Sequence, residues 1–446
     1  MPVRIAGNTG NEMIDQGLVR KYSGIEFAGT EKIRELQETM LRDHLRYLIS
    51  HSPYYGMVLG DVEIDGLTLD KLPSLPFTDK NAIEECNDDF LAVPMSKIVD
   101  IVMSSGTTGK PTRIMYTEHD MKRLAYNEEI SLAGCGVTHD DVVLLTCTMD
   151  RCFIAGLAYY LGARGLGAAV IRNGISSMAS HREIIRQMRP TVIVGVPTLL
   201  LKLGLFLKAQ NVDPRGVGVT RLVCIGEPIR DKELSLLKIG KYLEEIWGAA
   251  VFSTYASSET ITSFCECISM QGGHLHPDLA IVEIINDDGA VLPFGEVGEV
   301  VVTPLAIEGM PLLRFKTGDV SFLIERPCTC GRNSLRLGPI LGRKKQMIKC
   351  RGTTLYPNAI HSVLDGIGEI SEYYLEVTND FDLSDRVRIY VSLNDDSYSA
   401  ERIMDKLQAH LRIRPEVEIV SEQSIRTEVY AENSRKLTRF KDRRKS

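Results

Sequence analysis

The chain carries the sequence SSGTTGKPT at Ser104–Thr112, directly after the apolar run Ile98–Met103. This stretch combines hydroxyls, glycines and one cation, so main-chain N–H groups and side-chain donors can approach a polyanion closely. It differs from the common nucleotide loop G-x-x-x-x-G-K-[ST], because Pro111 stands where that loop has its magnesium-binding hydroxyl and disfavours a helical Lys110. The stretch therefore predicts a phosphate-binding loop of another class. A flexible linker is the alternative, but it gives no reason for Lys-Pro after the glycines.

Length and composition indicate a multidomain globular protein. A chain of 446 residues is longer than one ordinary hydrophobic core supports, so two or more domains are expected. The net charge of -7 argues against nucleic acid as a partner. The sequence has no apolar run approaching the roughly 18 residues of a membrane helix, and Met1–Arg4 lacks the apolar start of a secretion signal. We therefore expect a cytoplasmic enzyme whose ten cysteines are thiols or metal ligands.

Apolar periodicity predicts an α/β fold. Residues 31–60 favour a helix that ends at Pro53. Further along, helical stretches alternate with three apolar runs, Val142–Leu145, Ala168–Ile171 and Val192–Val194. This alternation is typical of parallel sheets covered by helices. Residues 280–305 change to shorter strands separated by turns, which indicates a β-rich subdomain.

The pattern changes again after Arg343. Apolar and polar residues alternate over 387–393, as in a half-buried strand, and a helix near Ala400–Leu411 and a strand at Val417–Val420 follow. We predict a large domain at 1–342, with its β-rich subdomain at about 265–342. A small, mobile α+β domain at 343–446 is joined to it by a hinge.

Further segments resemble those of acyl-adenylate-forming enzymes, and the phenylacetate–CoA ligase branch in particular, over nearly the whole chain. They are Leu75–Lys80, Leu91–Pro94, Phe153–Leu157, Ile225–Pro228, Tyr255–Glu259, Phe315–Asp319, Gly342–Lys349 and Ser434–Phe440. The resemblance implies that ATP and Mg²⁺ activate a carboxylic acid as an acyl-adenylate, after which the thiol of CoA accepts the acyl group. The C-terminal domain of such enzymes rotates on its hinge between the two steps, which excludes water from the intermediate.

The resemblance also implies the nucleotide site. The loop at 104–110 would bind pyrophosphate, the turn at 226–228 would frame the adenine, and Ile225 stands where the family has a glycine. Tyr255 would stack on the adenine, Ser258 would reach the α-phosphate, and Asp319 would accept hydrogen bonds from both ribose hydroxyls. Arg343 would contact the ribose and phosphate. The implied binding residues are Ser104, Ser105, Gly106, Thr107, Thr108, Gly109, Gly226, Glu227, Pro228, Tyr255, Ser258, Asp319 and Arg343.

Three charged side chains are implied to act in catalysis: Lys436, Glu259 and Lys110. Lys436 would bridge the carboxylate and the α-phosphate, where negative charge develops, and one donor in such a position contributes roughly 3–4 kcal/mol. Glu259 would help to hold Mg²⁺ on the phosphates, since that ion prefers oxygen ligands. A solvated carboxylate or an exposed lysine is the alternative for each residue taken alone.

Four residues predict a structural zinc site. Cys328 and Cys330 lie one residue apart and can bind one ion, and Cys267 with His274 would complete a closed tetrahedral set. Members of the phenylacetate branch have a similar arrangement. Cys265 and His276 could substitute for two of the ligands, and buried thiols are the alternative. The isolated cysteines are interpreted as small core residues: Cys86, Cys135, Cys147, Cys152, Cys224 and Cys350.

The acid is expected to bind near Phe153, Ala158, Tyr255 and the segment 195–197. Phe153 favours an apolar, aromatic acid. Asp150 stands where phenylacetate ligases often carry a tyrosine, which favours a hydroxylated or amino-substituted aryl acid.

The expected partners are a small carboxylic acid, ATP and CoA, and a homodimer is common among the relatives. An adenylating enzyme with another acceptor (a carrier-protein thiol, an amine or a deazaflavin hydroxyl) is the second reading. A non-catalytic nucleotide sensor is the third, and the complete set of Glu259, Asp319, Arg343 and Lys436 argues against it.

Overall fold

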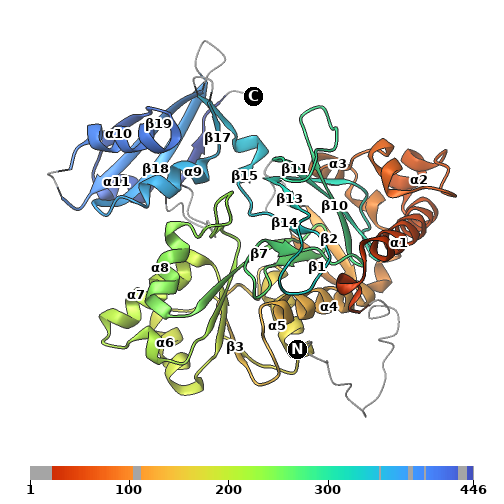
Figure 1. Ribbon diagram of the computed structural model, residues 1–446, viewed down its shortest axis with the longest axis horizontal. Helices are drawn as coiled ribbons and strands as arrows, with labels where there is room; N and C mark the ends of the chain where they lie inside the picture. Colours follow the sequence, from red (N-terminus) through yellow and green to blue (C-terminus); the bar gives the residue numbers. More distant parts are fainter. Residues whose placement is uncertain are drawn as a thin grey trace.

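The computed structural model describes residues 23–103, 112–350, 353–379, 385–395, 398–429 and 439–444. A large N-terminal domain is followed by a smaller C-terminal domain that lies to one side of it (Figure 1). The predicted fold class is confirmed, with a parallel sheet covered by helices, a β-rich region and an α+β C-terminal domain. Among the described residues, no helix combines the length and the apolar character that crossing a membrane requires.

A six-stranded sheet in the order β4-β3-β5-β6-β7-β8 forms the centre of the large domain. Its first five strands are parallel, and the edge strand β8 is antiparallel to β7. The strands are β3 (Val142–Leu145), β4 (Ala169–Arg172), β5 (Val192–Gly195), β6 (Arg221–Ile225), β7 (Ala250–Ser257) and β8 (Thr262–Cys265). The helices beside it are α4 (Glu118–Gly134), α5 (Ala155–Gly165), α6 (Met178–Met188), α7 (Pro197–Ala209) and α8 (Lys238–Trp247).

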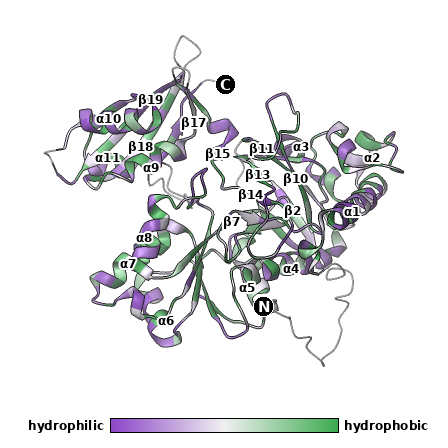
Figure 2. Cartoon of the chain, in the orientation of Figure 1, coloured by the Kyte–Doolittle hydropathy of each residue, from purple (hydrophilic) through white to green (hydrophobic). Residues whose placement is uncertain are grey.

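Both faces of this sheet are buried, which explains why its strands are continuous apolar runs. Val143 and Leu145 point to the side covered by α4 and α5, whereas Leu144 packs on the opposite side against α7 and α8. Outer helices such as α6 and α10 (Ala400–Leu411) carry both hydrophobic and hydrophilic residues (Figure 2). The three predicted apolar runs correspond to β3, β4 and β5, and each agrees with the structure to within one residue at each end.

The predicted end of the N-terminal helix at Pro53 is confirmed, and a second, short helix follows it. Helix α1 (Thr30–His51) ends before Pro53, and α2 (Pro53–Leu59) begins at that proline. Ser52 accepts a hydrogen bond from the amide of Tyr55, so it caps α2, and proline is favoured at the first helical position. Helix α3 (Lys80–Glu85) follows and is capped by Asp79.

Short antiparallel sheets form the β-rich region beside α1 and α3 (Figure 1). One sheet contains β10 (Ala280–Ile285), β11 (Gly298–Pro304), β12 (Phe315–Ser321) and β15 (Gly342–Arg343). Another contains β13 (Leu323–Ile324), β14 (Arg336–Leu337) and β9 (Gly273–His274). A hairpin-like pair, β1 (Ile98–Met103) and β2 (Arg113–Thr117), flanks residues 104–111.

The C-terminal domain is built on the sheet β20-β19-β18-β21. Its strands are β18 (Ile370–Asn379), β19 (Asp385–Leu393), β20 (Glu416–Ile419) and β21 (Phe440–Asp442). Its other elements are β16 (Ile348–Cys350), β17 (Thr353–Leu355), α9 (Pro357–Leu364), α10 and α11 (Glu422–Val429). The predicted helix at 400–411 matches α10 at both ends, because Ser399 caps it and Arg412 ends it in a left-handed conformation.

The interpretation of the isolated cysteines as core residues is wrong for Cys152, which is exposed. It lies in the turn between β3 and α5, where Arg151 and Cys152 have φ values of 59 and 53°. Two consecutive residues in the left-handed conformation turn the chain sharply here and leave the thiol exposed. The prediction rested on the small, apolar side chain, which gives no information about this backbone conformation. Cys86 is half-buried, and Cys135, Cys147, Cys224 and Cys350 are buried as predicted.

Buried His44 makes the stability of the large domain depend on pH. Its Nε2 donates to the carbonyl of Leu312 at 2.9 Å, and burial lowers its pKa to about 4. An unfolded histidine has a pKa of about 6.5, so the unfolded state binds more protons between these values and stability falls as the pH falls through that window. The variant His44→Gln keeps a hydrogen-bond donor but does not titrate. Between pH 7 and pH 5, we expect its free energy of unfolding to fall by about 2 kcal/mol less than that of the wild type. Urea unfolding at both pH values measures this, and equal losses in the two proteins would contradict it.

Candidate active site

The predicted pyrophosphate loop, Ser104–Lys110, and Lys436 lie outside the described residues. The strands that flank the loop are described, and β1 and β2 pair up to Met103 and Arg113. The remaining residues predicted for the nucleotide site come from the carboxyl ends of β6 and β7 and from β12 and β15. Ligands of open α/β sheets bind at this edge.

Glu259 is a buried, ionised carboxylate that follows β7. Its Oε1 lies 3.0 Å from Nζ of Lys80, and its Oε2 accepts a hydrogen bond from Oγ of Ser257 at 2.8 Å. Burial alone would raise the pKa of Glu259, but the charge of Lys80 and the hydrogen bonds outweigh burial, so the pKa lies below its ordinary value. A carboxylate held in the charged form is suited to an oxygen-preferring cation such as Mg²⁺.

Lys80 is a site residue to which the sequence analysis gave no role. It begins α3, nearly 180 residues before Glu259 in the chain, and the sequence offered only its place in the Leu75–Lys80 segment. The structure explains the contact: the amide of Thr78 donates to the carbonyl of Arg314, and the amide of Lys316 donates to the carbonyl of Thr78. These two bonds attach the segment to β12, the strand that carries Asp319.

Asp319 lies between an aromatic donor and a cation. Tyr255 donates its hydroxyl to Oδ2 of Asp319 at 2.8 Å, and Nε of Arg343 lies 3.5 Å from Oδ1. Burial raises the pKa of Asp319, while Arg343 and Tyr255 oppose that increase. Because Asp319 and Arg343 are paired across β12 and β15, the register of these strands sets their spacing. Tyr255, Glu259, Asp319 and Arg343 therefore share one region.

The turn Gly226–Pro228 follows β6 directly. Gly226 has a φ of 75°, in the left-handed region that glycine adopts without strain. Ile225, which replaces a glycine of the family pattern, is the last residue of β6 and needs no unusual conformation. Both carboxylate oxygens of Glu227 bind Thr198: Oε2 accepts from its amide at 3.1 Å and Oε1 from its hydroxyl at 2.9 Å. These bonds connect the turn to α7.

The four predicted metal ligands lie together. The ligand atoms of Cys267, His274, Cys328 and Cys330 are all within 4.8 Å of one another. Sγ of Cys267 is 3.6 Å from Sγ of Cys328, and Sγ of Cys330 is 3.4 Å from Nε2 of His274. Burial lowers the pKa of His274 to about 3, so the imidazole is neutral, as a metal ligand must be. Three thiols and one imidazole are the kind of donor set that structural zinc sites use.

The two alternative ligands lie elsewhere. Sγ of Cys265 is 3.2 Å from Sγ of Cys135, and Nε2 of His276 is 3.2 Å from Oγ of Ser131. Each therefore has a partner outside the cluster. Cys265 is the last residue of β8, so Cys267 lies beyond the strand, where the strand period that would put both thiols on one side no longer applies.

We expect about one zinc ion per chain, bound by this cluster. Cys330→Ser should lose the ion, which would join β9 to the segment before β14. Loss of a few kcal/mol of stability, at roughly 2–4 °C per kcal/mol, lowers the unfolding midpoint on the order of 10 °C. Elemental analysis and a thermal scan measure both quantities. Cys265→Ala is the matched control, a neighbouring thiol outside the cluster, and should keep the ion. Loss of zinc from the control alone would contradict the assignment.

Comparison with known proteins identifies the family. Residues 55–305 match the AMP-binding enzyme family, and residues 352–444 match the C-terminal domain of AMP-binding enzymes. The chain belongs to the AMP-binding enzyme family. The predicted resemblance is thereby confirmed.

Curated and solved relatives of this AMP-binding enzyme agree with the match. A phenylacetate–coenzyme A ligase of Thermus thermophilus is 33% identical over 381 residues, 83% of this chain and 84% of the relative. A phenylacetate–coenzyme A ligase of Pseudomonas putida is 28% identical over 410 residues, 89% and 86% of the two chains. The crystal structure of a 2-hydroxyisobutyryl-CoA ligase in complex with R3-HIB-AMP superposes with a TM-score of 0.82 at 21% identity, covering 93% of this chain and 90% of that one. At that identity the superposition establishes the shared fold.

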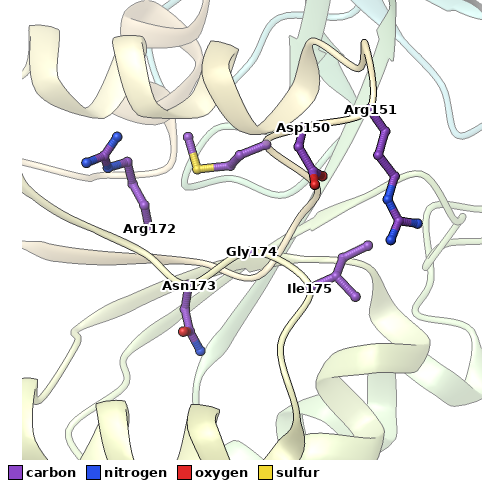
Figure 3. A pocket seen from close by; sticks show the side chains of 7 residues that line it. Asp150, Arg151, Arg172, Asn173, Gly174 and Ile175 are labelled. Atoms are coloured by element: carbon purple, nitrogen blue, oxygen red, sulfur yellow. The ribbon is translucent and has the colours of Figure 1, made fainter.

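A polar pocket of about 270 Å³ opens at the carboxyl ends of β3 and β4 of the AMP-binding enzyme (Figure 3). The lining residues are Met149, Asp150, Arg151, Arg172, Asn173, Gly174 and Ile175. Asp150, singled out by the sequence, lines this pocket. Phe153 follows three residues later and is 38% exposed.

The other predicted acid-binding residue, Ala158, is buried. It is 3% exposed and packs in a core cluster with Val102, Ile114 and Tyr116. The segment 195–197 leads into Thr198, the partner of Glu227, so it borders the turn at 226–228. The predicted acid residues thus divide into an exposed group near Phe153, a core residue and a segment beside the nucleotide residues.

Proposed function

We propose that this AMP-binding enzyme is an acid–CoA ligase that activates an aryl carboxylic acid of the phenylacetate type. The reaction class, ATP-dependent formation of an acyl-adenylate and transfer to CoA, rests on the family and on its phenylacetate–coenzyme A ligase relatives. The observation that carries the site assignment is the ionised Glu259 near the Tyr255–Asp319–Arg343 group at the carboxyl edge of the sheet.

In the first step, a carboxylate oxygen of the acid attacks the α-phosphorus of ATP. The bond from that phosphorus to the oxygen that bridges the α- and β-phosphates breaks, and pyrophosphate leaves toward Ser104–Lys110. Asp319 accepts hydrogen bonds from the ribose hydroxyls, Tyr255 stacks on the adenine, and Arg343 contacts the ribose and phosphate. Lys436 stabilises the charge that develops on the α-phosphate. When bound, Mg²⁺ neutralises phosphate charge, and Glu259 is the residue that would hold it.

In the second step, the thiol of CoA attacks the acyl carbon and AMP leaves. The proposed boundary between the domains, after residue 342, precedes Arg343 and the hinge segment. A hinge there lets the C-terminal domain withdraw Lys436 while the nucleotide residues of the large domain stay in place. The β-rich subdomain at about 265–342 contains the proposed zinc ligands, whose role is structural. A homodimer is proposed on the resemblance alone, and light scattering measures it.

The proposed acid carries a polar substituent on its ring. The pocket that contains Asp150 also contains Arg151 and Arg172, so its lining is charged, whereas phenylacetate has an apolar ring. A hydroxyl or amino group at that end would find donors and acceptors in the pocket, and an apolar ring would leave the charged groups without compensation. This supports a hydroxylated or amino-substituted aryl acid.

Release of pyrophosphate, measured over a panel of acids with and without CoA, tests the proposal. We expect kcat/KM for 4-hydroxy- or 4-aminophenylacetate to exceed that for phenylacetate by about tenfold, the effect of one compensated polar group. Asp150→Tyr should reduce or reverse this preference. An acyl-CoA product identifies the acceptor, whereas adenylate without thioester would favour the carrier-protein, amine or deazaflavin acceptors. Silence over the whole panel would contradict the ligase assignment and favour a nucleotide sensor.

A further inference from the structure

Glu266 is a buried carboxylate that contacts three segments of the large domain, at Arg230, Ser253 and Gly272. It lies just after β8, and its Oε1 is 2.6 Å from Nε of Arg230, a pair whose side chains are 2 and 7% exposed. Oε2 accepts a hydrogen bond from the amide of Ser253 at 2.9 Å, and the amide of Glu266 donates to the carbonyl of Ser253. Both oxygens are therefore engaged inside the protein.

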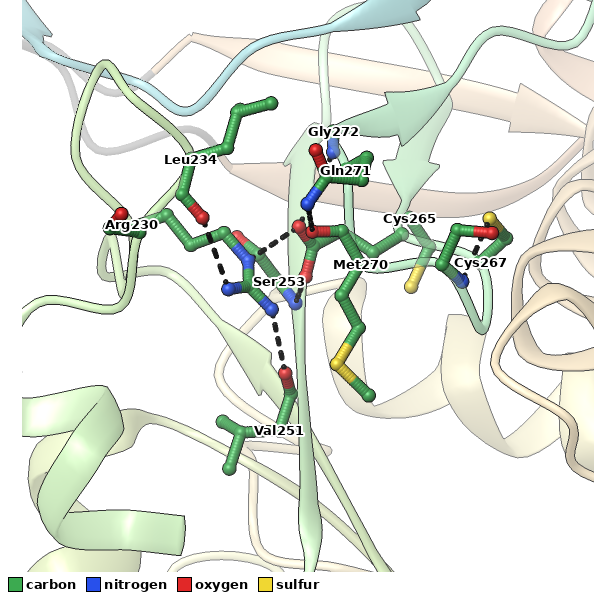
Figure 4. Close-up of polar contacts among 12 residues, drawn as sticks. Arg230, Leu234, Val251, Ser253, Cys265, Cys267, Met270, Gln271 and Gly272 are labelled. Carbon is green, nitrogen blue, oxygen red and sulfur yellow. Dashed lines mark hydrogen bonds and ion pairs between the residues drawn. The ribbon is translucent and has the colours of Figure 1, made fainter. Parts of the chain in front are cut away.

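Arg230 holds the chain that follows the turn at 226–228. Its guanidinium also donates to the carbonyls of Leu234 and Val251, each at 3.3 Å (Figure 4). Arg230 is the second residue after Pro228, and residues 229–237 fold back on themselves through the bond from the amide of Leu237 to the carbonyl of Ile229. The ion pair thus fixes one end of the turn against β7.

Ser253 lies on the same strand as Tyr255, two residues before it and therefore on the same side of β7. Ile225, the residue before the turn, pairs with Thr254 between them. Glu266 consequently touches both sequence segments to which the proposed function assigns the adenine: the strand with Tyr255, directly, and the turn Gly226–Pro228, through Arg230.

We propose that Glu266 is a positioning residue for the adenine end of the nucleotide site, acting through Arg230 and Ser253. A buried ion pair in which both carboxylate oxygens accept hydrogen bonds is rigid, because breaking it leaves an unpaired charge in a low-dielectric interior. Glu266 therefore sets the gap between the turn and Tyr255 that the adenine ring enters. This inference rests on the proposed function, and binding measurements separate the two.

Glu266→Gln keeps the shape of the side chain and removes its charge. With AMP as the probe of the adenine and ribose end, we expect the Kd from calorimetry to rise about tenfold, which is about 1.4 kcal/mol. The Kd of inorganic pyrophosphate, the probe of the phosphate end, should not change. Arg230→Lys keeps the charge but loses the fork that reaches Leu234 and Val251, and should weaken AMP binding in the same selective way. It serves as the second variant if Glu266→Gln does not fold.

Asp141→Asn is the matched control. Asp141 pairs with Arg221 at the amino end of β6, the strand whose other end enters the turn, at an N–O distance of 3.4 Å. This variant should lower the unfolding midpoint without changing the Kd of AMP. A Glu266→Gln protein that is less stable but binds AMP like the wild type would overturn the inference and leave the proposed function intact. A wild type that does not bind AMP would overturn both.

Discussion

Replacement of Lys436 by alanine should slow adenylate formation by about 10²–10³-fold, the usual effect of removing one donor from a developing oxyanion. The acid and the α-phosphate are both negatively charged as they approach, and the proposed role of Lys436 is to offset that repulsion in the transition state. Its effect should fall on kcat more than on the Kd of AMP, since the charge on the α-phosphate increases as the bond to the acid forms.

The two half-reactions separate this role from a general effect of charge. Lys436→Ala should convert a supplied acyl-adenylate to the CoA thioester at the wild-type rate, because the proposed rotation of the C-terminal domain withdraws the lysine before that step. Lys406→Ala is the control, since Lys406 is an exposed lysine of α10 in the same domain, and both of its half-reactions should be unchanged. An unchanged rate of pyrophosphate release in Lys436→Ala would refute the catalytic assignment.

Replacement of Glu259 by glutamine should lower the rate of adenylation by about 10²-fold, as expected when one charged group that acts on the phosphates is lost. The amide keeps the size of the side chain and the contact with Ser257. It removes the negative charge that Lys80 stabilises at 3.0 Å and that the proposal uses to hold Mg²⁺. The remaining Lys80 then adds an uncompensated positive charge near the cation, which weakens its binding further.

The dependence of pyrophosphate release on Mg²⁺ concentration distinguishes this role from a structural one. Glu259→Gln should need more Mg²⁺ for half-maximal rate, with part of the rate restored at high concentration. Ser257→Ala removes only the hydrogen bond to Oε2, and it should shift the Mg²⁺ requirement less. If Glu259→Gln has the wild-type Mg²⁺ requirement, the carboxylate does not hold the ion.

Local sequence signals predicted the elements whose limits depend on local chemistry. Helix α10 begins after a serine cap, and the strand at 142–145 is an apolar run of four residues between turns. The end of α1 just before Pro53 was predicted from that proline, whereas the short helix α2 that Ser52 caps after it was not. The direction of β8 depends on pairing with β7, which no periodic pattern records.

The sequence predicted those residues of the candidate site that belong to motifs. Tyr255, Asp319 and Arg343 lie together because Asp319 pairs with Arg343 across β12 and β15 and accepts a hydrogen bond from Tyr255 of β7. The contact between Lys80 and Glu259 joins residues from distant parts of the chain and depends on the attachment of Thr78 to β12. Such contacts follow from tertiary packing, and one sequence holds no signal for them.

Both edges of the central sheet are built in a way that disfavours pairing with another copy of the chain. An edge strand with free N–H and C=O groups can pair with another copy of the chain and start aggregation. At one edge, β8 continues into the loop where Glu266 forms an antiparallel bridge with Gly273. At the other, β4 has only four residues, ends in Arg172, and is followed by Gly174 with a φ of 58°. A short edge strand that ends in a charged residue and then turns away gives another chain little to pair with, so the apolar inner strands stay covered on both sides.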